Sequence, residues 1–361
     1  MDAWNFPSTP ARSSGFTLLE LMISIAIGLV IIGALSFLYV GSRGAYRVNE
    51  SLARVQETGR LALDFLQEDV RAGGFLGCRS RNVSNVNVMM IARPAIAFAG
   101  TGDAVRGFED GVGWINPTTI TRVRGDVLNL RRAIGIGDEI AANTDVAGAK
   151  VTLKNNCSGL RQSDYVALGS CDRMVVLRIT NTPAQTCSAA MTPVVLEHAA
   201  NGAVGGNGNN GTVSGSDSHK ILTPFNIDSR ATAYRFDDVS FFVGQNPAGR
   251  PSLYRTSING AVEELVENVE DLDLVFGIDT STPADGIADS YVRADGVTNW
   301  SQAVSVRISV VVAGPEANVL TQAQTYNFGT TASGTVQTVS GADTRLRQVF
   351  ATTITLRNRL P

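Results

Sequence analysis

The sequence predicts an α+β fold in which one long N-terminal helix packs against a head of mainly antiparallel β-strands. The first observation is an uncharged apolar run over residues 21–40, followed by helical spacing of apolar residues to about residue 72. The second is that residues 75–361 alternate short apolar runs with clusters of Gly, Asn and Pro, as strands and turns do. We therefore expect a helix and a β-rich head.

The apolar run from Leu21 to Val40 predicts a membrane anchor. Its twenty residues contain no charged side chain, and as a helix they span about 30 Å, the thickness of a bilayer's hydrocarbon core. Cleavable secretory signals usually have a shorter apolar core of about 7 to 15 residues. Cleavage at Ser42-Arg43-Gly44 is the alternative to a retained anchor.

Residues 41–74 predict the amphipathic continuation of this helix. Its apolar positions follow helical spacing, and charged residues occupy the other faces; the apolar set is Val48, Leu52, Val55, Ala62, Leu66 and Val70. A helix from Phe16 to about Ala72 would be roughly 85 Å long, with its second half packed on the head. Gly73-Gly74 is the predicted end of the helix.

A single carboxylate stands where the apolar run begins, in Gly15-Phe16-Thr17-Leu18-Leu19-Glu20. An acid inside an apolar segment costs about 2.5 to 3.5 kcal/mol on insertion scales unless it is paired. The hexapeptide resembles the cleavage and methylation motif of type IV prepilins and type II secretion pseudopilins. The resemblance implies that prepilin peptidase removes a leader, residues 1–15, by cutting between Gly15 and Phe16, and that it N-methylates Phe16.

The same resemblance implies a type IV pilin-like fold and an assembly role for Glu20. Residues 16–40 would be the transmembrane and filament-core half of the helix. In a bundle of staggered helices, the Glu20 carboxylate could meet the N-terminal ammonium of Phe16 on a neighbouring subunit, in surroundings of low dielectric constant. Glu20 would then set the register of assembly.

Three further stretches resemble PilW-type minor pilins: residues 66–78, residues 268–308 and the Leu356-Arg357-Asn358-Arg359 ending. The resemblance implies a non-enzymatic protein that primes pilus assembly, at the pilus tip, with links to adhesion and twitching motility. Its implied partners are other minor pilins, the major pilin, prepilin peptidase, the inner-membrane assembly platform and a tip adhesin. Its implied location is the inner membrane, single-pass with a periplasmic head, and then the filament or its tip.

Two other functions remain open. A J-like pseudopilin of type II secretion would have the same architecture in a periplasmic pseudopilus. A membrane-tethered binding ectodomain would keep its N-terminus intact and would not need Glu20. A major pilin is disfavoured, because those subunits are usually smaller and no cysteine follows Cys187 for a C-terminal loop.

The head is predicted to contain strands at residues 127–130, 165–168, 174–179, 234–243, 304–312 and 349–356. Asn259-Gly260 within residues 251–267 predicts a hairpin with a type I′ turn. Residues 201–218 are nearly all small or polar and predict a flexible loop or a subdomain divider. Asp69 and Arg71 are two apart and do not face each other on a helix, so no salt bridge is implied between them.

Four cysteines form an even set beyond the anchor: Cys78, Cys157, Cys171 and Cys187. An exported head meets oxidising conditions, so we expect two disulfides, with all three pairings open. The two histidines, His198 and His219, are expected at the surface because neither belongs to a zinc-binding pattern.

Residues 279–289 form an acidic, Gly-containing loop, and Asp279, Asp285 and Asp289 are weak candidates for calcium ligands. Proline and alanine occupy positions where an EF-hand needs ligand oxygens, so a plain turn is favoured and no cofactor is expected. The chain lacks common hydrolase, metalloprotease and phosphate-binding motifs, and pairs such as Asp237-Asp238 alternate faces in a strand. Its net charge of −3 disfavours nucleic acid.

Overall fold

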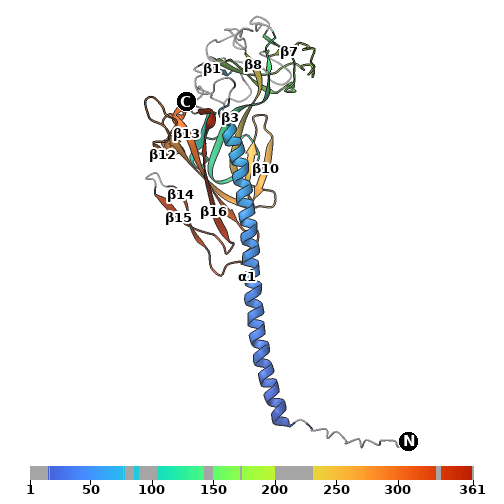
Figure 1. The fold of residues 1–361 in the computed structure, drawn as a ribbon, viewed down its shortest axis with the longest axis vertical. Coiled ribbons are helices and arrows are strands. Elements are labelled where there is room, and N and C mark those ends of the chain that lie inside the picture. Colours follow the sequence, from blue (N-terminus) through green and yellow to red (C-terminus); the bar gives the residue numbers. More distant parts are fainter. Residues whose placement is uncertain are drawn as a thin grey trace, which may run out of the picture.

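The computed structural model describes residues 15, 17–75, 77, 85–88, 104–141, 149–170, 173–199, 231–330 and 335–359. Helix α1, Leu18–Ala72, extends from a β-rich head, and its N-terminal half stands clear of that head (Figure 1). This arrangement confirms the predicted α+β class. Phe16 and the tract 201–218 lie outside the described residues.

Two main sheets build the head. The larger has the order β1-β6-β5-β8-β3-β2, with β9 pairing β8 and β10 pairing β9. Its strands are β1 (Asn85–Val88), β2 (Val105–Phe108), β3 (Arg122–Glu139), β5 (Tyr165–Gly169), β6 (Arg173–Arg178), β8 (Thr232–Gln245), β9 (Pro251–Thr256) and β10 (Val262–Glu267). The smaller sheet has the order β12-β11-β13-β16, with β11 (Val269–Ile278), β12 (Ser290–Arg293), β13 (Ala303–Ala313) and β16 (Arg347–Thr355).

Two minor sheets pair β4 (Lys150–Leu153) with β7 (Val194–Glu197), and β14 (Thr325–Thr330) with β15 (Val336–Ser340). Within the described ranges only the β1–β6 pair is parallel. All six predicted strand ranges fall almost wholly within strands. Among these six the largest difference is β3, which has 18 residues where the sequence predicts four, because its ends are charged and contain glycines. The sequence did not predict β1, β2, β4, β7, β11, β12, β14 and β15.

The β9–β10 hairpin forms where the sequence predicts it, but its turn is not of type I′. That turn needs a positive φ at both central residues. Here Gly260 has φ +87°, whereas Asn259 is not among the residues with positive φ. Instead Gly260 N donates to Ser257 O at 2.9 Å, and Ser257 also donates through Oγ to Asp237 on β8 at 2.6 Å. Because Asp237 holds the loop, the three-residue turn that contains Gly260 replaces the two-residue one.

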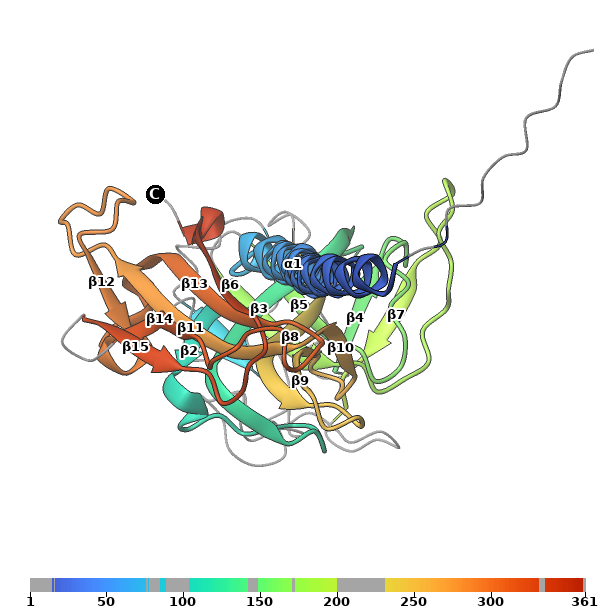
Figure 2. The same cartoon turned by 90° about the horizontal axis from the view of Figure 1, so that it is seen from below.

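The C-terminal half of α1 packs on the outside of the head, mainly against β16 and β13 (Figure 2). Its buried apolar side chains lie on one face, as the helical spacing predicts: Val55, Ala62, Leu66 and Val70. They join a core that both main sheets share, with Leu128 and Phe241 from the larger sheet and Ile308 from the smaller. The head therefore holds the helix along a continuous apolar face.

The C-terminal end of the chain caps α1. Asn358, in the short turn Arg357–Arg359, donates its side-chain amide to the carbonyl oxygens of Arg71 at 3.2 Å and Gly73 at 3.1 Å. The last carbonyls of a helix lack partners within it, so this amide supplies the donor they need. The helix ends at Ala72 as predicted, and Gly74 takes φ +77°, a conformation that suits glycine.

Gly59 is required where α1 meets β16. A Cβ built there would lie 2.3 Å from the ring of Phe350. We expect Gly59→Ala to lower the free energy of unfolding by about 1 to 3 kcal/mol, because overpacking forces the ring or the helix to shift. Thermal unfolding of the detergent-solubilised protein measures this. The matched control is Gly44→Ala, where a Cβ has open space, and there alanine should be neutral or stabilise the helix. Equal effects of the two substitutions would contradict the packing argument.

Candidate functional site on the N-terminal helix

The first turn of α1 is closed by a capping box between Thr17 and Glu20. The Thr17 hydroxyl accepts a hydrogen bond from Glu20 N at 3.2 Å, and the Glu20 carboxylate accepts one from Thr17 N at 3.5 Å. This satisfies two backbone donors that the first turn otherwise leaves free. Glu20 itself is exposed, so a single negative charge sits at the start of an apolar helix.

The first half of α1 presents apolar side chains on every face. The exposed set is Leu18, Leu19, Leu21, Met22, Ile23, Ile25, Ile27, Leu29, Val30, Ile31, Ile32, Leu35, Phe37, Leu38, Tyr39, Val40 and Tyr46. The helix is long and apolar enough to cross a membrane, and none of its most apolar window is buried against the head. A helix that is apolar all round needs lipid or other helices around it. This segment is therefore suited to anchor the chain in a membrane.

Gly15, the predicted residue before the cleavage point, is exposed, and a Cβ there would meet nothing within 4 Å. Thr17, immediately after the predicted N-terminal residue, is exposed as well. Phe16, the predicted methylation site, lies outside the described residues. The described residues on either side of the predicted cleavage point are thus free of contacts with the head.

Asp69 is a residue whose role the sequence does not reveal. It is buried near the end of α1 and forms ion pairs with two arginines of the larger sheet, Arg132 on β3 at 2.5 Å and Arg255 on β9 at 3.1 Å. Arg71 instead donates to Gln67 at 3.3 Å, in agreement with the absence of an Asp69–Arg71 pair. Asp69 therefore fixes the helix to the head by charge, next to the apolar contacts.

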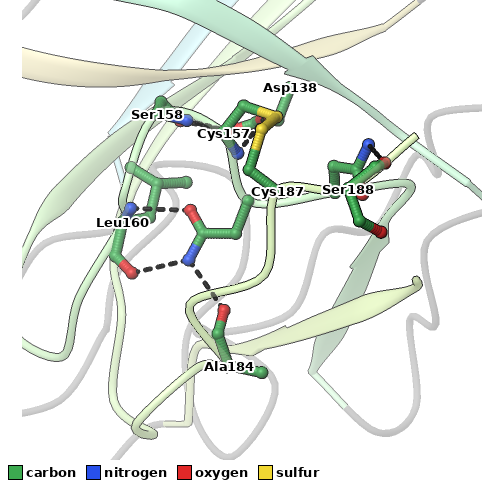
Figure 3. Close-up of a disulfide and its surroundings, with 9 residues drawn as sticks. Asp138, Cys157, Ser158, Leu160, Ala184, Cys187 and Ser188 are labelled. Atoms are coloured by element: carbon green, nitrogen blue, oxygen red, sulfur yellow. Dashed lines mark hydrogen bonds between the residues drawn. A yellow bond between two sulfur atoms is a disulfide. The ribbon is translucent and has the colours of Figure 1, made fainter. Parts of the chain in front are cut away.

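A disulfide joins Cys157 to Cys187, in the region of the small β4–β7 sheet (Figure 3). The turn that carries Cys157 is fixed by Asp138, whose carboxylate accepts hydrogen bonds from Cys157 N at 2.8 Å and Ser158 N at 3.1 Å. The bond crosslinks chain segments 30 residues apart. The other two cysteines, Cys78 and Cys171, lie outside the described residues.

The expectation that His198 lies at the surface is wrong. Its side chain is fully buried. His198 directly follows β7, and its backbone N donates to Ala149 O, directly before β4, at 3.0 Å. This hydrogen bond continues the β4–β7 pairing by one residue, and the His198 side chain points to the buried face. His219 lies outside the described residues.

The acidic loop at residues 279–289 uses its carboxylates to shape itself. Asp279 is buried and accepts hydrogen bonds from Ser281 N at 3.0 Å and Gly286 N at 2.8 Å. Asp289 accepts from Thr280 N at 2.7 Å, which lowers the pKa of its carboxyl. Among the residues that the structure describes, no group of three or more His, Cys, Asp or Glu side chains could hold a metal ion. The three candidate ligands Asp279, Asp285 and Asp289 therefore do not form such a group.

Asp126, on β3, is a buried acid with an unusual pKa. Its carboxylate accepts hydrogen bonds from Asp110 N at 2.9 Å and Leu274 N at 2.8 Å. Burial raises the pKa of this carboxyl to about 8, the two amide bonds lower it, and the charges of Glu109 and Asp273 add to the rise. The carboxyl is thus an acid that folding favours in its protonated form.

We expect the protein to become less stable as the pH rises from about 4 to 8. The folded state binds up to one more proton at Asp126 than the unfolded state does in this window, so this group alone lowers the free energy of unfolding by at most about 1.4 kcal/mol per pH unit. Asp271 adds to the lower part of the window, because burial raises its pKa to about 6. Asp126→Asn should flatten the dependence between pH 6 and 8, measured by chemical denaturation, whereas Asp285→Asn, at an exposed position, should not. An unchanged slope in the Asp126 variant would contradict this assignment.

Two family models match the chain. Residues 240–358 match "Type IV Pilus-assembly protein W", called PilW, and residues 10–36 match the "Prokaryotic N-terminal methylation motif". The first range runs from β8 to the turn that caps α1, and the second contains the capping box and the first part of the apolar helix. No curated protein and no solved structure matches the chain.

Proposed function

We propose that the chain is a PilW-type minor pilin that takes part in type IV pilus assembly, and that it primes filament growth from the pilus tip. The observation that supports this most is the exposed apolar half of α1 with Glu20 at its start. A large head on one long helix suits a subunit at the end of a filament, because its bulk need not repeat along the shaft. As an assembly protein it acts through its surfaces and not through catalysis.

In this proposal, prepilin peptidase cuts between Gly15 and Phe16 and methylates the new N-terminus. Before assembly, the helix lies in the inner membrane and the head lies in the periplasm. The Glu20 carboxylate then pairs with the N-terminal ammonium of a neighbouring pilin as the subunit leaves the membrane. Other minor pilins, the major pilin and the assembly platform are the partners that this route requires.

The pilus is favoured over type II secretion because the matched family is a pilus-assembly family over residues 240–358, within the head. A tethered ectodomain is disfavoured because the methylation motif is matched around the Gly15 to Glu20 segment. These reasons rest on different parts of the chain, so each can be tested separately.

The test is the intact mass of the membrane-extracted protein, expressed with and without a prepilin peptidase. We expect a peptidase-dependent loss of residues 1–15 and the gain of one methyl group. Gly15→Leu should block the loss, whereas Gly28→Leu, at an open position within the same helix, should not. An unchanged mass in the presence of an active peptidase, or a cut near Gly44, would overturn the proposal.

A further inference from the structure

A pocket of about 460 Å³ lies on the larger sheet. Its floor is a row of polar residues that pair directly across four strands: Arg106 with Asn129, Asn129 with Ser240, and Ser240 with Thr256. Their neighbours along the strands, such as Leu128, point into the main core. Since successive side chains of a strand point to opposite faces, the polar row faces away from that core.

Two tryptophans line this floor from separate loops. Trp114 packs against Phe242 with ring centroids 5.0 Å apart, and its indole N–H donates to Ser240 Oγ at 3.3 Å. Trp300 meets Phe276 edge-on at 4.8 Å. Each indole therefore has a fixed position, and each is only partly buried.

Because Gly107 on β2 has no side chain, the Phe276 ring that supports Trp300 can pack directly against β2. A Cβ at this position would lie 2.5 Å from the Phe276 ring and 2.9 Å from the side chain of Ala294. The Phe276 ring supports Trp300, so the pocket depends on the absence of a side chain at Gly107. The pocket is thus built by specific contacts between β2, β11 and the loop after β12.

Two residues that line the pocket each have a buried acceptor oxygen with no hydrogen-bond partner among the described residues. Asn129 is 5% exposed. Its amide nitrogen lies within donating distance of Asp238 Oδ1, of Ser240 Oγ at 3.0 Å and of Val239 O at 3.3 Å, which orients the amide. No described residue donates to its Oδ1. Glu109 pairs with Arg293 through Oε1, and its Oε2 is likewise unpartnered. Buried acceptors normally have a donor, so a ligand with donor groups would satisfy both.

The charges around the pocket are nearly balanced. Arg131 pairs with Asp238 at 2.9 Å, both of them at the pocket wall. The remaining lining charges are those of Arg106, Glu109 and Asp295, and both of these acids pair with Arg293 beside the pocket. This balance of charges favours a mainly neutral ligand.

We propose that this pocket binds a pyranose sugar. Hydroxyl groups of the sugar donate to Asn129 Oδ1 and Glu109 Oε2, and its C–H face lies against Trp114 or Trp300. Indole rings present a large apolar face, which suits the apolar face of a sugar ring. The volume accommodates one or two sugar units, and a mainly neutral, donor-rich ligand fits the charges. The inference concerns the head alone and goes beyond the role in assembly.

Intrinsic fluorescence tests it directly, because the chain has only three tryptophans, and the third, Trp4, is in the predicted leader. In a Trp4→Phe background both remaining indoles line the pocket, whether or not the leader is removed. The full chain is kept in dodecyldimethylamine oxide, a detergent without a sugar headgroup. The probes are the methyl pyranosides of glucose, galactose and mannose, and N-acetylglucosamine. Choline and arginine serve as cationic comparisons.

We expect at least one sugar to shift the tryptophan emission saturably, with saturation-transfer NMR placing the sugar C–H face against aromatic protons. Asn129→Ala should weaken that affinity about tenfold or more, because it removes the buried acceptor. Asn327→Ala, at an exposed asparagine of β14, is the matched control and should leave the affinity unchanged. If Asn129→Ala unfolds, Trp114→Phe provides the second variant, with weaker sugar binding expected.

Several results would overturn the proposal. No response to any of the four sugars at millimolar concentrations is one, and equal affinity in Asn129→Ala and Asn327→Ala is another. A response to choline or arginine without a response to sugars would assign the pocket to a cation instead. None of these results affects the mass experiment, so the assembly role and the sugar site can fail independently.

Discussion

Replacement of Glu20 by alanine is expected to leave the protein in the membrane but to reduce its incorporation into pili by at least about tenfold, because the neighbour's ammonium would be left unpaired in surroundings of low dielectric constant. Membrane insertion should persist, since the apolar run from Leu21 to Val40 is unchanged and loses a charged neighbour. Immunoblots of sheared pili against total membranes measure the ratio.

Glu20→Gln separates the cap that the structure shows from the ion pair that we propose for this side chain. Glutamine can keep the capping box with Thr17, because it also accepts at this position, but it cannot form the ion pair. If the charge is what matters, Glu20→Gln should fail as completely as Glu20→Ala. Glu57→Ala, an exposed acid further along the same helix, should assemble normally. Normal pili containing Glu20→Gln would refute the ion pair and leave only the cap.

The sequence predicts the helix well because the causes lie close together along the chain. Apolar spacing fixes the buried face from Val55 to Val70, the charge-free run fixes the exposed half, and Gly73-Gly74 ends the helix. The prediction of the strands succeeds for the same reason at the six predicted ranges, but it misses other apolar strands such as β4, β7 and β11. It falls short at β3, whose ends are charged or contain glycine and are held in the sheet by β8.

The features that the sequence could not predict depend on partners far apart in the chain. Asp69 and Arg255 are 186 positions apart, and Trp114 and Ser240 are 126 apart. No local sequence pattern indicates these pairs. Asp69 has the same charge as the other acids of the helix, so the sequence does not show that it is the buried one. The turn at Asn259-Gly260 differs for a similar reason, because Asp237, on another strand, determines its shape.

Replacement of Asp69 by alanine is expected to lower the free energy of unfolding by about 3 kcal/mol, within the range of about 3 to 5 kcal/mol seen when one partner of a buried ion pair is removed. Arg132 would lose its partner in a site where its side chain is only 14% exposed. Arg255 is 33% exposed and keeps Glu263 at 2.7 Å, so it should contribute less of the loss. Thermal and chemical unfolding of the detergent-solubilised protein measure the change.

Asp64→Ala is the matched control for Asp69, because Asp64 lies on the same helix and is exposed, so it should change the stability by no more than about 0.5 kcal/mol. If the loss comes from an unpaired cation, Arg132→Met in the Asp69→Ala background should restore much of it, since an apolar side chain at position 132 needs no counter-charge. The single variant Arg132→Met completes the comparison. If the double variant loses as much unfolding free energy as Asp69→Ala and Arg132→Met lose together, the two residues act independently. Asp69 would then hold the helix through its contact with Arg255 alone.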